Sequence, residues 1–179
     1  MVLSAGQKDS SASQISVFTG RGTLIESQGP CWFYGSGSEH STLYQYQLYK
    51  AKNIYMGHIQ SETPYYQPVP VAPKPFDTQK AFPGDPKFAC KGSESSCKES
   101  WALRIIDSSN IYIHGLGLYS FFINYDQSNG CIWDSSCQDR LLEVKGVKNV
   151  VLFNIFTIGA KEVGTGAGNT TIQADDTKR

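Results

Sequence analysis

The chain has 179 residues, 40% of them hydrophobic and 12% aromatic, and its 16 Lys and Arg balance its 16 Asp and Glu. This composition supports the core of one ordinary domain and excludes a chain that is disordered throughout. It also argues against nucleic-acid and membrane partners, because it offers no basic patch and no run of the ~18 apolar residues that a membrane span needs. With only 18% charged residues and abundant Ser, Thr, Asn, Gln, Gly and Tyr, it is typical of secreted carbohydrate-active proteins.

The N-terminal residues carry no secretory signal. The opening MVLSAGQKDS has neither a basic region nor an apolar stretch of the required length. The overlapping AGQKDSSASQ predicts a solvated loop or short helix, and strands are expected near ISVFTGRG and LIESQG. A chain of secreted composition without a signal is expected to be a fragment of a longer protein.

Three later segments share one pattern. Each has a polar approach, then Asn, then an alternating apolar run that predicts a strand: YKAKNIYMGHIQS, IDSSNIYIHGLGL and VKGVKNVVLFNIF. The unequal spacing of Asn53, Asn110 and Asn149 argues against a strict solenoid and favours coils that carry insertions on one side. We therefore predict an all-β fold, a right-handed parallel β-helix, with the three asparagines stacked at one corner and bonded through their amides.

The insertions are visible as polar, proline-rich segments. Residues 64–100 hold seven of the eight prolines, so they predict an ordered surface loop rather than sheet interior. The segments KGSESSCKES and DQSNGCIWDSSCQD predict two more excursions. Binding sites commonly form where such loops gather on one side of a rigid scaffold.

The cysteine spacing predicts two local disulfides, Cys90–Cys97 and Cys131–Cys137. The spacing and the lack of nearby histidines argue against the alternative, a structural zinc site, and we expect no metal. Two such bridges indicate an oxidising compartment. Cys31 is left over and is expected to act as a small buried hydrophobe.

Glu39 is the main candidate for chemistry. It lies in the glycine- and serine-rich GPCWFYGSGSEHSTLYQYQLY, among several aromatic residues. Aromatic rings stack on sugars, and a carboxyl beside apolar rings has a raised pKa, as a glycosidase acid requires. The alternative is a solvated turn glutamate paired with His40.

Two other glutamates compete for such a role. Glu62, in QSETPYYQP, could bind sugar hydroxyls or simply hydrogen-bond its own loop, whereas Glu26 fits the polar face of a strand. The histidines at 40, 58 and 114 lack metal-ligand spacing, and His114 fits a half-buried strand. No nucleotide-binding or serine-hydrolase motif occurs.

Several blocks together resemble the C-terminal part of fungal glycoside hydrolase family 55. They are QISVFTGRGTLIESQGPCWFYGSGSEHSTLYQYQLYKAKNIYMGHIQSETPYYQP, CKESWALRI and FFINYDQSNGCIWDSSCQDRLLEV, within a match over residues 14–159. The resemblance implies an exo-acting, inverting β-1,3-glucanase that releases glucose or a short glucoside from the non-reducing end. It implies no cofactor, and β-1,3-glucan becomes the expected partner.

The resemblance also assigns expected roles to individual residues. The glutamate of the SEH block resembles the general acid, which implies this role for Glu39. Trp32, Tyr44 and Tyr66 become candidate sugar-facing rings by residue type and proximity, and Glu62 a candidate substrate-binding residue.

Family members are longer, with two tandem β-helical domains and the active site between them. Residues 1–179 are accordingly expected to form most of the second domain, lacking the groups that position the nucleophilic water. The sequence leaves open a non-catalytic β-helix remnant that binds glucan or a protein through residues 65–88. A pectin lyase-type enzyme is disfavoured, because no Asp cluster suggests calcium ligands. The first coil, without an upstream neighbour, is expected to expose an apolar edge and promote self-association.

Overall fold

A computed structural model describes residues 17–89, 99–165 and 171–173, which form strands, turns and loops. The strands are β1 (Arg21–Ile25), β2 (Cys31–Gly37), β3 (Tyr44–Tyr49), β4 (Lys52–Ser61), β5 (Trp101–Ile106), β6 (Ser109–Tyr119), β7 (Gln138–Lys145), β8 (Lys148–Ile158), β9 (Ala160–Thr165) and β10 (Thr171–Gln173). Within these residues, no helix has the length and apolarity needed to cross a membrane.

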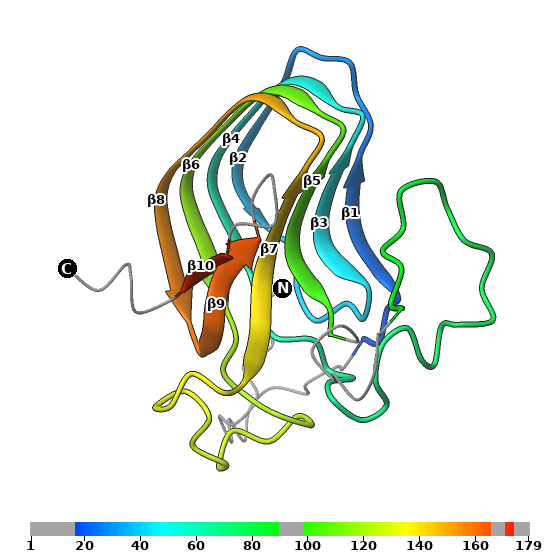
Figure 1. Ribbon diagram of the computed structural model, residues 1–179, viewed down its shortest axis with the longest axis vertical. Coiled ribbons are helices and arrows are strands. Elements are labelled where there is room, and N and C mark those ends of the chain that lie inside the picture. Colours follow the sequence, from blue (N-terminus) through cyan, green and yellow to red (C-terminus); the bar gives the residue numbers. More distant parts are fainter. Residues whose placement is uncertain (1–16, 90–98, 166–170, 174–179) are drawn as a thin grey trace, which may run out of the picture.

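The strands form two sheets, and the chain alternates between them (Figure 1). One sheet has the order β1-β3-β5-β7-β9-β10 and the other β2-β4-β6-β8. All pairings between neighbouring strands are parallel except that of β10 with β9. The prediction of an all-β fold with parallel strands is confirmed, and the arrangement is consistent with a β-helix.

The two ends of the coils differ (Figure 1). At the upper end in this view, two-residue turns at 50–51, 107–108 and 146–147 join β3 to β4, β5 to β6 and β7 to β8. We call this the turn end. At the opposite, loop end, the connections span 38–43, 62–100 and 120–137. The long insertions therefore gather at one end of the coils.

The predicted asparagine stack is confirmed at the turn end. Asn110 Nδ2 donates to Asn53 Oδ1 at 2.9 Å, and Asn149 Nδ2 donates to Asn110 Oδ1 at 2.9 Å. The three residues have φ of 57°, 55° and 53°, in the left-handed region that asparagine tolerates better than most residues. In each coil, asparagine thus both tolerates the left-handed backbone and supplies an amide to the ladder.

The core lies between the sheets and consists of like residues stacked in register. On the four-stranded sheet, Ile54 pairs with Ile111, and Met56 pairs with Ile113. All four side chains are buried. Burial of each such side chain contributes roughly 1.5–3 kcal/mol, so this repeated stack is a main source of stability.

A second backbone feature bends the four-stranded sheet. Gly35, His58, Gly115 and Asn154 occupy equivalent positions in β2, β4, β6 and β8, and all have positive φ. A left-handed residue interrupts the alternation of a strand, so one such residue in each strand turns the whole sheet.

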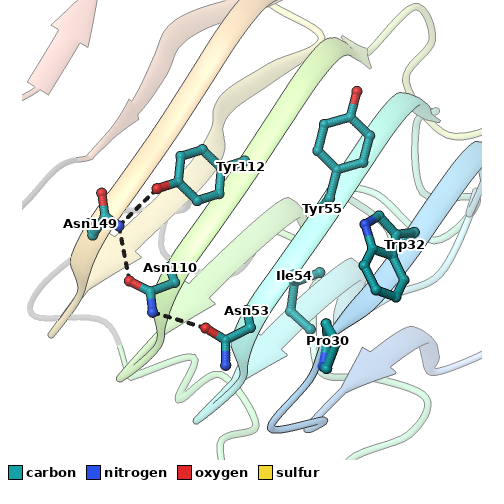
Figure 2. A pocket seen from close by; sticks show the side chains of 8 residues that line it. All are labelled: Pro30, Trp32, Asn53, Ile54, Tyr55, Asn110, Tyr112 and Asn149. Atoms are coloured by element: carbon teal, nitrogen blue, oxygen red, sulfur yellow. Dashed lines mark hydrogen bonds between the residues drawn. The ribbon is translucent and has the colours of Figure 1, made fainter.

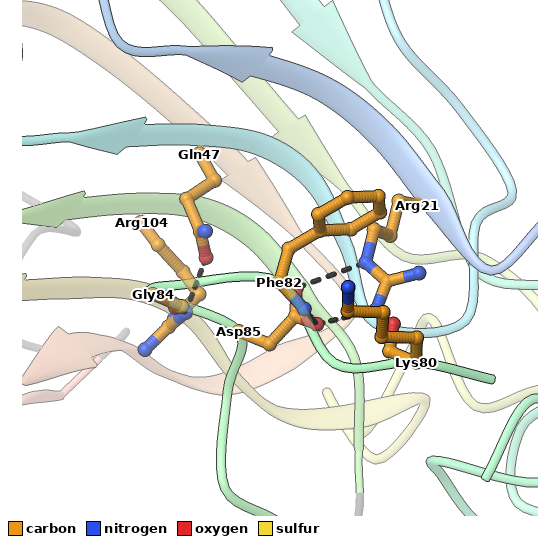
Figure 3. A network of polar contacts seen from close by, with 7 residues as sticks. All are labelled: Arg21, Gln47, Lys80, Phe82, Gly84, Asp85 and Arg104. Carbon is orange, nitrogen blue, oxygen red and sulfur yellow. Dashed lines mark hydrogen bonds and ion pairs between the residues drawn. The ribbon is translucent and has the colours of Figure 1, made fainter. Parts of the chain in front are cut away.

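The proline-rich insertion is anchored to the six-stranded sheet by two arginines (Figure 3). Arg21 on β1 makes a two-pronged ion pair with Asp85 and lies 4.6 Å from the centroid of the Phe82 ring. Burial alone would raise the pKa of Asp85, but hydrogen bonds from Arg21 and the Phe82 amide outweigh burial and lower it. The ionised carboxylate is therefore favoured.

The second arginine, Arg104 on β5, is almost fully buried. It donates to the Gly84 carbonyl oxygen at 2.7 Å, to Glu143 Oε2 at 2.6 Å and to Gln47 Oε1. One cation therefore links the insertion to β3, β5 and β7.

The Cys131–Cys137 disulfide is present as predicted. Cys90 and Cys97 lie outside the described residues. Cys31 is a free thiol of intermediate burial that packs against the core and donates to Ser27 Oγ at 3.1 Å.

Candidate active site

Two glutamates lie together at the loop end. Glu39 follows β2 and Glu62 follows β4, and these two parallel strands are neighbours. Both side chains therefore leave the carboxyl ends of adjacent strands. They are mostly buried, with 13% and 11% of the side chain exposed. A solvated turn glutamate, the alternative weighed for Glu39, does not fit this burial.

Gln60 joins the two carboxyl groups. Its Nε2 donates to Glu39 Oε1 and to Glu62 Oε1, each at 3.0 Å. Gln60 pairs with Gly37 in the β2–β4 register, which places its amide beside the turn that carries Glu39. A side-chain amide has two N–H donors, so it can serve both acceptors at once. The remaining Oε2 atoms are left to face His40.

His40 supplies a neutral nitrogen to this pair. Its Nδ1 lies 2.6 Å from the Thr63 carbonyl oxygen, which can only accept, so Nδ1 carries the proton. Burial lowers the pKa of His40 and favours the neutral ring. Its Nε2 lies 3.4 Å from Glu62 Oε2 and 4.0 Å from Glu39 Oε2, and has no hydrogen-bond partner. This lone pair can accept a proton from a protonated carboxyl group.

The pKa of Glu62 is raised. Burial, followed by the nearby charge of Glu39, raises the pKa of Glu62 to about 7, although the hydrogen bond from Gln60 acts in the opposite direction. The raised pKa favours the protonated form of this carboxyl more than in an ordinary glutamate. A raised carboxyl pKa beside a second carboxyl is the arrangement found in acid–base sites.

Aromatic rings form the wall of the cluster. The His40 ring stacks on Tyr65 with centroids 4.1 Å apart, and Phe122 lies 6.1 Å from His40. Phe18 contacts Tyr65 at 5.2 Å and Tyr66 at 4.7 Å. These apolar neighbours exclude water from the imidazole and explain why its charged form is disfavoured.

The other candidate residues lie at different places. Tyr66 is half-buried against Phe18 at the loop end. Tyr44 is fully buried, so its ring offers no open face to a sugar. Trp32 is the second residue of β2, near the turn end, whereas Glu39 follows β2 at the loop end. Proximity in sequence to Glu39 therefore did not bring these two rings to the carboxyl pair.

Gln60 and the acceptor nitrogen of His40 were missed by sequence reasoning. The SEH block did place His40 beside Glu39, but only the strand register shows that Gln60 bridges both acids. The structure also brings one ligand atom each of Glu39, His40 and Glu62 within 4.8 Å of one another, close enough to hold a metal ion. Sequence spacing gave no sign of such a group.

Curated proteins similar to this chain come from fungi. A "Probable glucan endo-1,3-beta-glucosidase" of Arthroderma benhamiae is 46% identical over 156 residues, covering 83% of this chain and 17% of that protein. A "Glucan 1,3-beta-glucosidase" of Cochliobolus carbonum is 39% identical over 166 residues, covering 89% of this chain and 20% of that protein. This chain is a relative of the glucan 1,3-beta-glucosidases. Its sequence therefore resembles a segment of these glycoside hydrolases.

The printed name of a third relative of this chain does not mention glucan hydrolysis. The "Non-secreted LysM effector LysM15" of Penicillium expansum is 45% identical over 151 residues, covering 84% of this chain and 9% of that protein. The chain thus spans at most a fifth of the length of these three relatives. No known protein-family profile matches it.

Proposed function

We propose that this chain supplies the proton-donating part of an active site that hydrolyses β-1,3-glucan, with Glu39 as the general acid. The observation that carries the proposal is the buried cluster in which Gln60 holds Glu39 and Glu62 beside a neutral histidine. The named activity of the relatives supports the choice of β-1,3-glucan.

In this proposal, Glu39 gives its proton to the departing glycosidic oxygen. The resulting carboxylate keeps its hydrogen bond from Gln60. Glu62, with its pKa near 7, and the free Nε2 of His40 limit the negative charge that accumulates in the cluster. Glu62 and His40 thereby act as positioning residues for the acid.

We further infer that the enzyme acts from the non-reducing end with inversion. An inverting base stands roughly 6.5–9.5 Å from the acid so that a water fits between them. Glu62 approaches Glu39 within 4.8 Å, so it is too close for that role. The water-activating group would then come from another segment, which we expect to be a preceding β-helical domain, with this chain as the second, right-handed β-helix.

We also propose that the protein is secreted. The Cys131–Cys137 disulfide supports a secreted protein, because such bridges persist in oxidising surroundings.

The test uses a chimera in which this chain replaces the matching segment of the Arthroderma relative. Glu39→Gln keeps the size of the side chain but removes its proton. We expect hydrolysis of laminarin to fall at least ~100-fold while binding is retained. Glu26→Gln, an exposed glutamate at the turn end, is the matched control and should leave the rate unchanged. Undiminished hydrolysis by Glu39→Gln would remove Glu39 from the mechanism.

The products of the same chimera test the stereochemistry and the mode of attack. Glucose released with the α-configuration, seen by NMR in the first minutes, supports inversion. A β-configured product would instead favour retention, and longer oligosaccharides as first products would overturn the exo mode.

The alternative function is a non-catalytic remnant that binds glucan or a protein. A folded, active chimera would exclude this alternative, whereas an inactive chimera that still binds laminarin would support it.

A further inference from the structure

The outer face of the four-stranded sheet carries rows of aromatic residues. One row consists of Trp32, Tyr55 and Tyr112, which are paired in register across β2, β4 and β6. Trp32 is 60% exposed and Tyr112 is 44% exposed. In the next row, His114 stacks on Phe153 with centroids 5.3 Å apart. Residues of this size are normally buried, so their exposure on one face calls for a ligand or partner.

Three hollows follow this face along the strands. The first, of about 450 Å³, lies near the turn end and is lined by Trp32, Tyr55, Tyr112 and the asparagine ladder (Figure 2). The second, of about 390 Å³, shares Tyr55 and Tyr112 with it. The third, of about 280 Å³, reaches Gln60, whose amide holds Glu39 and Glu62. The hollows therefore lie along the strands between the turn end and Gln60.

The chemistry of these hollows suits an uncharged, hydroxyl-rich ligand. No Asp, Glu, Lys or Arg is among the residues that line them. Their apolar surface comes from aromatic rings and a few aliphatic side chains, and their polar groups include amides, hydroxyls and imidazoles. Flat rings with a few polar groups bind sugars through their apolar faces and their hydroxyls.

The asparagine ladder holds the Tyr112 ring in position through a hydrogen bond. Asn149 Nδ2 donates to Tyr112 Oη at 2.9 Å, as Figure 2 shows. The tyrosine hydroxyl therefore accepts from the ladder and keeps its own hydrogen for a ligand. A ring held in place before binding loses less conformational entropy when a ligand arrives.

We propose that the outer face of the four-stranded sheet binds a β-1,3-glucan chain and guides it toward the carboxyl cluster. The identity of the polysaccharide rests on the proposed function, but the binding face does not depend on Glu39 being the acid. In this proposal Trp32 binds a sugar unit that is remote from the cleaved bond, and it does not contact the sugar beside Glu39.

The test measures binding of laminarin to this chain carrying Glu39→Gln, so that hydrolysis does not interfere. Trp32→Ala should weaken binding at least ~10-fold, as expected when a large aromatic anchor is removed. Tyr112→Phe should weaken it by a few-fold, since only the hydroxyl is lost. Trp133→Ala is the matched control, because Trp133 is 90% exposed but lies in the 120–137 loop. A polygalacturonate probe should bind weakly.

The outcomes separate this proposal from the proposed function. Unchanged laminarin binding by folded Trp32→Ala, or equal loss in Trp133→Ala, would overturn the binding face even if Glu39 is the acid. Self-association that Trp32→Ala abolishes, without laminarin binding, would show a protein interface instead. If laminarin binding depends on Trp32 but hydrolysis by the chimera is unaffected by Glu39→Gln, the binding face is supported and Glu39 is not the acid.

Discussion

The turn end and the loop end of the coils are built by different kinds of interaction. At the turn end, one residue type repeats in equivalent positions, and the Asn53–Asn110–Asn149 ladder needs only the strand register. At the loop end, Glu39 and Glu62 are brought together by Gln60 and His40, which have no equivalents in the other coils. The repeated end forms a regular scaffold, and the irregular end holds the candidate active site.

The two ends also differ in their electrostatic environments. The ladder consists of neutral amides at the surface, where water can replace any bond that is lost. The loop end instead holds buried ionisable groups, whose protonation depends on their neighbours. Substitutions at the loop end should therefore have larger and more pH-dependent effects than substitutions at the turn end.

The largest loss of stability is expected where the insertion is anchored to the sheet. Arg104→Met removes a cation that contacts Gln47, Gly84 and Glu143. We expect the free energy of unfolding to fall by about 3 kcal/mol, because breaking a buried ion pair leaves a charge without its partner. Chemical denaturation measures this change.

The control for Arg104→Met is Lys161→Met. Lys161 pairs with Asp139, but 58% of its side chain is exposed. Exposed pairs contribute little, so the change should stay below about 1 kcal/mol. Equal effects of the two substitutions would show that the insertion is not anchored through Arg104.

The repeated parts of the fold were accessible from the sequence. The three Asn-containing segments predicted parallel strands and the ladder, because strand alternation and left-handed asparagines are local properties. The spacing of Cys131 and Cys137 likewise predicted their disulfide, because it closes a short loop.

The candidate active site was less accessible from the sequence. Glu39 and Glu62 could be named as separate candidates, but their closeness depends on the β2–β4 register. Trp32 lies near Glu39 in sequence, yet an extended strand carries it to the other end of the coil. Tyr44 is buried by tertiary packing, which residue type alone does not reveal.

The ladder can be tested at its central residue. Asn110→Ala removes two amide hydrogen bonds and places a Cβ-bearing, non-asparagine residue at a φ of 55°. We expect a loss of about 2 kcal/mol from the free energy of unfolding. Asn110→Gly relieves the backbone strain while still losing the bonds, so it should cost about 1 kcal/mol. Equal losses for both variants would show that backbone strain contributes nothing here.

The raised pKa of Glu62 predicts a pH dependence of stability. The folded state binds the Glu62 proton more tightly than the unfolded state, whose glutamates titrate near 4.3. The stabilisation is thus complete below about pH 4 and is lost as the pH rises toward 7. Glu62→Gln removes this dependence, and should gain on the order of 1–2 kcal/mol relative to the parent between pH 4 and 8.

Thermal unfolding across this pH range measures the Glu62 effect. Burial raises the pKa of Glu99 to about 7. The stability of the Glu62→Gln variant should therefore still decrease somewhat as the pH rises over this range. Glu26→Gln serves again as the exposed control. If Glu62→Gln follows the parent at every pH, Glu62 does not hold the proton of the cluster.

The smallest effect is expected at Gly35, in the row of left-handed residues that bends the four-stranded sheet. A Cβ added at Gly35 would meet nothing within 4 Å, so its φ of 62° is the main constraint on this position. Asn154 adopts a φ of 55° in the same row, so Gly35→Asn should change the free energy of unfolding by less than about 0.5 kcal/mol. Gly35→Val should cost about 1–2 kcal/mol, because a β-branched residue is strained at positive φ. Denaturation of the two variants measures the difference. If the Val variant is as stable as the Asn variant, β2 does not need a left-handed residue at position 35. The bend of β2 would then be set by the neighbouring strands.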